Sequence, residues 1–142
     1  MKIDSHIITE YINSYSKNKI IIHREIFPDV NSIDIGFLLS QSIYNWRDDS
    51  KLSMKVTSEL DKLFNDELVI HSSYGRTIAI SNIGILLEPN LKQDLRAILE
   101  KYSNNNTLFV KWDGEVENGY LYFLSKEKGI KININELSHI IV

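Results

Sequence analysis

The spacing of apolar residues divides the chain into segments of helical and of extended character. In residues 4–16 apolar side chains recur at helical spacing, which predicts a helix with Asp4 or Ser5 as its N-cap. Lys19–His23 (KIIIH) is a short β-branched run that is typical of a buried strand. In chain order, the remaining predicted extended segments are 32–35, 68–70, 77–80, 107–112, 120–124 and 130–134, and the remaining predicted helices are 36–46, 53–65 and 89–102.

Turn residues complete this pattern. Pro89-Asn90 is expected to open the helix over 89–102, and Asn118-Gly119 predicts a tight turn between two apolar flanks. The apolar residues 139–142 are expected to be buried. Because strands alternate with helices, we expect an α/β fold, with a mostly parallel, P-loop-like sheet flanked by helices and antiparallel strands added at the C-terminus.

Length and composition are those of one globular domain. The 142 residues fit a single domain over 1–142, and 43% hydrophobic with 25% charged residues is an ordinary composition for a packed protein. The chain has no cysteine, which excludes disulfides and thiolate zinc sites. No secretory signal is evident, and apolar runs such as 20–22 are too short to span a bilayer. We therefore expect a cytoplasmic protein with no membrane segment.

Charge and residue spacing give little support for catalysis or metal binding. The formal net charge is -3 and the basic residues are spread out, so there is no general attraction to nucleic acid. The histidines are scattered, without a second ligand at suitable spacing. No Gly-x-Ser-x-Gly motif is present. The sequence thus predicts no catalytic residue, no cofactor-binding residue and no metal ligand.

Three segments carry a resemblance to a known family. They are residues 32–42 (SIDIGFLLSQS), 80–99 (ISNIGILLEPNLKQDLRAIL) and 104–122 (NNNTLFVKWDGEVENGYLY). Together they resemble BrxF, the family of small P-loop proteins in type III BREX bacteriophage-defence systems. The resemblance extends over about residues 19–124, with the segments in the same order and at similar spacing. It implies a P-loop-like fold and a setting in bacteriophage defence.

The phosphate-binding loop of a P-loop protein is absent from this sequence. Such a loop has the pattern Gly-x-x-x-x-Gly-Lys-Ser/Thr, because its backbone amides approach the phosphates and its lysine neutralises their charge. Residues 23–32 (HREIFPDVNS) contain neither glycine nor lysine. Glu25 and Asp29 place negative charge there, and Pro28 lacks a backbone donor. We expect this segment to disfavour a polyanion.

Two further positions lack the groups that triphosphate hydrolysis requires. An acid at the end of the neighbouring strand would organise magnesium and water, but the extended run 77–80 is followed by Ser81. The resemblance places the family's next glutamate at Gly84. Neither residue binds the ion strongly or acts as a base. We therefore expect a degenerate, non-catalytic relative rather than an enzyme.

Because we expect no catalysis, we expect the protein to act by binding other proteins. The resemblance implies a component or regulator of a bacteriophage-defence system, with larger protein partners among the other components of that system. We expect the contact surface beyond the strand 107–112, where ligands bind in α/β folds and where aromatic residues could anchor a partner. The candidate residues are Trp112, Asp113, Gly114, Glu115, Asn118 and Tyr120. In a competing interpretation, they form a hairpin whose tryptophan packs on the core.

The sequence also allows two alternative functions, DNA binding and catalysis. Residues 55–81 could form a helix and a β-wing with Arg76 near its tip, as in a winged-helix DNA-binding protein. Against this, the helix is rich in acids and poor in bases, whereas phosphate contacts need lysine and arginine. A hydrolytic or transfer enzyme would require a pocket that gathers His23, Asp29 and Ser81.

Overall fold

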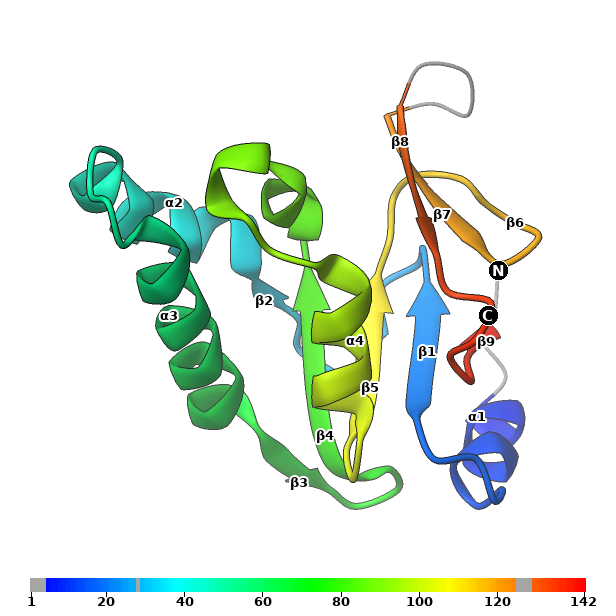
Figure 1. Cartoon of the computed structure of the whole chain (residues 1–142). Coiled ribbons are helices and arrows are strands. Elements are labelled where there is room, and N and C mark those ends of the chain that lie inside the picture. Colours follow the sequence, from blue (N-terminus) through cyan, green and yellow to red (C-terminus); the bar gives the residue numbers. More distant parts are fainter. Residues whose placement is uncertain (1–4, 28, 125–128) are drawn as a thin grey trace.

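A computed structural model describes residues 5–27, 29–124 and 129–142. The strands of its central sheet are β1 (Lys19–His23), β2 (Ile33–Asp34), β3 (Val69–His71), β4 (Gly75–Ser81), β5 (Thr107–Lys111) and β9 (Ile140–Ile141). The order is β2-β4-β5-β1-β9, and these five strands are parallel (Figure 1). The remaining strand, β3, pairs antiparallel with the first half of β4. The predicted α/β class with a mostly parallel sheet is confirmed.

A second, antiparallel sheet lies near the C-terminus. Its strands are β6 (Val116–Glu117), β7 (Tyr120–Phe123) and β8 (Ile130–Asn133), in that order. Asn118 and Gly119, with φ of 53° and 80°, form the turn between β6 and β7. This confirms the predicted Asn-Gly turn, since left-handed backbone at both central residues suits a two-residue hairpin.

The helices cover the parallel sheet unequally. They are α1 (Ser5–Ile12), α2 (Ile35–Trp46), α3 (Leu52–Glu67) and α4 (Leu95–Ser103), with 3-10 helices η1 (Ile83–Leu87) and η2 (Pro89–Leu91). On one face, α2, α3 and α4 pack on Ile20 and Ile22 of β1. On the other, α1 and the segment that follows β1 pack on Ile21. Since successive strand residues point to opposite faces, the all-isoleucine interior of β1 places apolar side chains in both layers.

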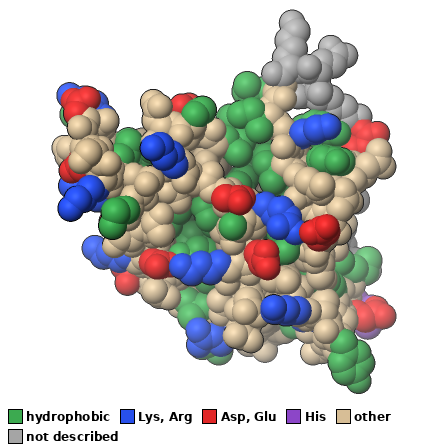
Figure 2. All heavy atoms as spheres, in the orientation of Figure 1, with side chains coloured by type: hydrophobic (Ala, Val, Ile, Leu, Met, Phe, Trp, Pro, Cys, Tyr) green, Lys and Arg blue, Asp and Glu red, His purple; other side chains and the backbone are tan. Residues whose placement is uncertain are grey.

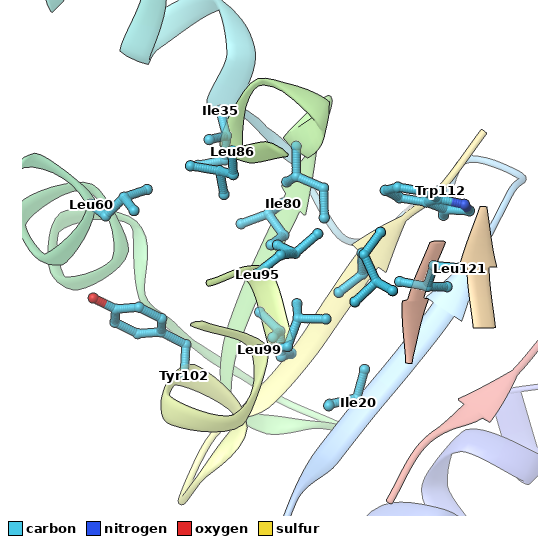
Figure 3. Close-up of a cluster of buried hydrophobic side chains, with 14 of the residues drawn as sticks. Ile20, Ile35, Leu60, Ile80, Leu86, Leu95, Leu99, Tyr102, Trp112 and Leu121 are labelled. Carbon is cyan, nitrogen blue, oxygen red and sulfur yellow. The ribbon is translucent and has the colours of Figure 1, made fainter. Parts of the chain in front are cut away.

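The larger core joins both sheets (Figure 3). Phe64 of α3 stacks on Tyr102 of α4 with ring centroids 3.8 Å apart, and the Tyr102 hydroxyl donates to Asp61. Leu121 of β7 belongs to the same cluster and lies near Trp112 at the end of the parallel sheet. The three-stranded sheet is therefore attached to the parallel sheet through shared apolar burial.

The helix predicted over 89–102 begins later than expected. Pro89 opens only the short η2, and Lys92 then adopts a left-handed backbone with φ of 51°. The regular helix starts at Leu95, because the Asp94 carboxylate accepts a hydrogen bond of 3.1 Å from the Ala97 amide. Asp94 thus provides the start signal that the sequence interpretation assigned to proline.

Two predictions near the chain ends are also corrected. The helix predicted over 4–16 ends at Ile12, and Ser5 is already helical; Asp4 lies outside the described residues. None of residues 139–142 is buried as predicted: three are half-buried and Ile141 is 54% exposed, because β9 is an edge strand. In the described part of the chain, no helix is both long and apolar enough to cross a membrane.

The strands β3 and β4 pair as a hairpin, as a β-wing would. However, β4 also pairs in parallel with β5 and β2 and is an interior strand of the sheet. Asp66 and Glu67 of α3 are exposed, whereas Asp61 is half-buried and contacts α4; Val56, Leu60 and Phe64 are buried in the core. The hairpin therefore differs from the projecting wing of a winged helix.

Candidate functional site

Four parallel strands end at the same edge of the sheet, and their last residues meet at one hollow. We call this the strand-end pocket; it has a volume of about 520 Å³. Its polar lining comes from the carboxyl ends of β1, β2, β4 and β5 and from residues beside them in the chain; it consists of His23, Asn31, Ser32, Asp34, Ser81, Asn82, Lys111 and Asp113. This edge is where ligands bind in open α/β sheets. The strand β5 lies between β1 and β4, so the expectation that Ser81 ends a strand next to β1 is wrong.

A carboxylate occupies the N-terminus of α2 beside this pocket. Asp34 accepts a hydrogen bond of 2.9 Å from the Phe37 amide and one of 2.8 Å from Asn82 Nδ2. The close approach depends on Gly36, where a Cβ atom would lie 2.4 Å from Asn82 Nδ2. Helix N-terminal amides are the groups that bind phosphate in nucleotide-binding folds. Here the protein's own negative charge takes that position.

His23 is a buried, neutral side chain at the floor of the pocket. Its Nδ1 lies 2.7 Å from the carbonyl oxygen of Glu25, which requires Nδ1 to carry the proton and donate. The ring makes edge contacts with Phe27 and Phe109, at centroid distances of 4.7 and 6.0 Å. Nε2 is buried and has no hydrogen-bond partner in the described structure. Burial lowers the pKa of His23 because it disfavours the charged ring.

The pocket does not assemble a nucleophile and a base. It gathers His23 and Ser81, but Asp29 is not among the residues that line it. The Ser81 hydroxyl donates to the Ile33 carbonyl at 3.3 Å. Within residues 5–27, 29–124 and 129–142, His23 Nε2 has no hydrogen-bond partner, so Ser81 and His23 are not hydrogen-bonded to each other. An activated serine needs such a pair. Pro28, in the segment that follows β1, lies outside the described residues.

A second hollow adjoins the first, between η1 and β7. We call it the Trp112 groove; its volume is about 320 Å³. Its apolar lining comes from Ile83, Ile85, Trp112, Phe123 and Leu124. Hydrophobic side chains gather between the 3-10 helices and the three-stranded sheet on the molecular surface (Figure 2). The groove shares Asn82, Lys111 and Asp113 with the strand-end pocket, and a 2.7 Å ion pair joins Lys111 to Asp113 at their boundary.

Trp112 itself is part of the core rather than an exposed anchor. Its side chain is only 5% exposed and packs in the cluster that contains Leu121. This agrees with the competing interpretation in which the tryptophan packs inward. The indole Nε1 is buried and has no hydrogen-bond partner in the part of the chain that the structure describes, and a Cβ atom at Gly114 would lie 3.0 Å from it. The same Cβ would lie 2.2 Å from the Tyr122 carbonyl oxygen, so only glycine permits this close approach.

The other predicted contact residues lie at two different places, the Trp112 groove and the β6–β7 hairpin. Asp113 and Gly114 line the Trp112 groove, next to the exposed Glu115. Asn118 is exposed and Tyr120 half-buried at the β6–β7 hairpin; neither lines the groove. The sequence interpretation therefore identified one rim of the groove but not the groove itself.

Leu124 is the residue that sequence reasoning missed. It is 81% exposed at the groove and has a left-handed backbone with φ of 74°. Left-handed backbone is unfavourable for a leucine by about 1–2 kcal/mol. A leucine directly after the apolar strand Tyr120–Phe123 carries no local sequence signal for this conformation.

Comparison with protein-family models, with curated proteins and with solved structures gives no match. Among the described residues, no group of three or more His, Cys, Asp or Glu side chains is arranged to hold a metal ion. The chemistry of the site therefore rests on the side chains described above.

Proposed function

We propose that this chain is a non-catalytic, degenerate P-loop-like protein that acts through contacts with larger protein partners, as a component or regulator of a bacteriophage-defence system. The defence setting follows from the resemblance to BrxF. The observation that carries the protein-contact function is the Trp112 groove, an open apolar hollow with Leu124 81% exposed beside it.

The groove suits an apolar segment of another protein. Its lining presents Ile85, Phe123 and Leu124, and contiguous exposed apolar surface is typical of protein interfaces. Asp113 is exposed at one end, where it forms a 2.7 Å ion pair with Lys111. The best-matched partner segment is therefore one whose apolar side chains fill the groove.

The carboxyl edge of the sheet supports the non-catalytic part of the proposal. Asp34 at the α2 N-terminus would repel the phosphates that this position binds in nucleotide-binding proteins. The end of β4 offers Ser81 instead of an acid. The absence of cysteine suits the cytoplasm, which is the compartment we propose.

Affinity capture with matched surface variants tests the protein-contact function. Leu124→Glu places a charge in the groove, whereas Tyr15→Glu changes a fully exposed apolar residue outside it. We expect the tagged wild-type chain and Tyr15→Glu to retain the same bacterial protein, and Leu124→Glu to lose it while melting at the wild-type temperature. Equal capture by all three chains would contradict the proposal.

A further inference from the structure

We propose that a pocket at the amino end of the parallel sheet binds phosphate groups. This amino-end pocket has a volume of about 350 Å³, and its polar lining includes Ser16, Lys17, Lys19, Arg76, Asn105, Asn106 and Thr107. It lies at the opposite end of the strands from the Trp112 groove. The inference is therefore independent of the protein-contact function.

The parallel topology brings these residues together. Lys19 is the first residue of β1, Arg76 is the second residue of β4, and Asn105 and Asn106 directly precede β5. Because β1, β4 and β5 are parallel neighbours, their amino ends share one edge of the sheet. Lys and Arg side chains are spaced along this lower end of the molecule in the space-filling view (Figure 2).

The charge of this pocket is not neutralised internally. No Asp or Glu is among the residues that line it, although the whole chain carries a net charge of -3. In the described part of the chain, neither Lys17 nor Arg76 forms an ion pair. The Arg76 Nε donates a 3.1 Å hydrogen bond to Asn106 Oδ1, which leaves the two terminal guanidinium nitrogens for a ligand. An oriented guanidinium binds phosphate oxygens in pairs.

Lys19 adds a cation that is held in place by neutral groups. Its Nζ lies 3.2 and 2.8 Å from the Tyr11 and Ser14 carbonyl oxygens, and 2.9 and 2.7 Å from the Ser14 and Ser16 hydroxyls. These four neutral acceptors engage its three N–H donors, so Lys19 contributes positive charge to an anion rather than a direct hydrogen bond. Burial lowers the pKa of Lys19, and an anion nearby would oppose that effect.

The size and the number of cations define the ligand class. Three cations favour a ligand with at least two negative charges, and the volume is that of a small-molecule site. A ligand of this chemistry is either a free polyphosphate or two adjacent phosphates of a single-stranded nucleic acid.

Calorimetric titration with two probes tests the proposal. Inorganic pyrophosphate and a short single-stranded oligonucleotide are each titrated into the wild-type chain, Lys17→Glu, Arg76→Glu and Lys62→Glu. The last is the matched control, because Lys62 is exposed on α3, lies outside the pocket and undergoes the same change of charge. We expect Lys17→Glu and Arg76→Glu each to weaken binding about tenfold or more, and Lys62→Glu to change it less than about twofold.

The two probes separate the sources of phosphate. Binding of pyrophosphate alone indicates a free polyphosphate, and binding of the oligonucleotide, weakened by added salt, indicates a nucleic-acid backbone. Failure of both probes at millimolar concentration would overturn the proposal. Equal weakening by Lys62→Glu and Arg76→Glu would also overturn it, since binding would then depend only on overall charge.

Discussion

At the N-terminus of α2, a few side chains determine what the carboxyl edge of the sheet can bind. The Asp34 carboxylate accepts from a helix amide and from Asn82, so the position suited to an anion is already filled. Next to it, the buried His23 Nε2 has no hydrogen-bond partner among the described residues. These two side chains determine which polar groups the usual ligand edge of this α/β sheet presents.

The buried His23 predicts a specific dependence of stability on pH. Burial lowers the pKa of the folded-state ring below its ordinary value of 6.5, so the unfolded chain binds a proton that the folded chain excludes. The contribution of His23 is complete above pH 6.5 and is lost as the pH falls below it. We expect urea unfolding from about pH 7 to about pH 5 to show a steeper loss for the wild-type chain than for His23→Leu, by at most about 1.4 kcal/mol per pH unit.

The control for this measurement is His6→Asn, a change at an exposed histidine on α1. It should keep the wild-type slope. Parallel pH profiles for the wild-type chain and His23→Leu would show that the ring does not resist protonation in the folded state.

We expect a substitution at Leu124 to weaken partner binding without lowering the stability of the fold. Glycine adopts a φ of 74° without the steric cost that leucine meets, and removing the 81% exposed side chain loses little buried area. We expect Leu124→Gly to leave the free energy of unfolding unchanged or to raise it by up to about 1 kcal/mol, while partner capture falls. Chemical denaturation and the capture assay check the two parts. A loss of more than about 1 kcal/mol would assign Leu124 a structural role instead.

At the scale of elements, Gly114 joins the end of β5 to the three-stranded sheet. A Cβ atom there would lie 2.2 Å from the Tyr122 carbonyl oxygen, in the region where the Tyr122 amide donates to Glu115. Because the atom in the way belongs to the backbone of β7, a side-chain rotation cannot relieve the clash. The segment around Gly114 must therefore move away from β7. We expect Gly114→Ala to lower the free energy of unfolding by about 2–3 kcal/mol, measured by urea denaturation.

Gly75→Ala is the matched control, because Gly75 has a φ of 72° but no atom within 4 Å of an added Cβ. In Gly75→Ala only the left-handed backbone is unfavourable for alanine, and we expect it to lower the free energy of unfolding by about 1 kcal/mol. A Gly114→Ala cost no larger than that of Gly75→Ala would show that β6 and β7 adapt without loss.

The elements that sequence predicts well are those with strong local patterns. The isoleucines of Lys19–His23 and the helical spacing over 53–65 are sufficient for β1 and α3. At Pro89 and Asp94 two start signals compete, and both suit a helix N-terminus. The choice between them depends on the burial of Leu91 and the left-handed turn at Lys92, which tertiary packing sets. The partial exposure of β9 likewise depends on its place at the sheet edge.

At the scale of the whole molecule, the parallel sheet separates two hollows of different character. The Trp112 groove at the carboxyl end is apolar with the Lys111–Asp113 ion pair at its rim, and the amino-end pocket is basic. Sequence indicated Asp113, Gly114 and Glu115 because they follow a strong strand. It did not indicate Leu124 or the convergence of Lys17 with Arg76, because strand order determines which ends meet and local patterns do not encode that order.

The most direct test of the account is a calorimetric titration of magnesium-ATP into the wild-type chain and into Arg76→Glu. It measures whether the protein binds a nucleoside triphosphate in a magnesium-dependent manner. With Asp34 at the α2 N-terminus, we predict no magnesium-dependent binding in the micromolar range for either chain. Weak heat that is independent of magnesium and lost in Arg76→Glu would belong to the amino-end pocket. Micromolar, magnesium-dependent binding of ATP that persists in Arg76→Glu would contradict the account.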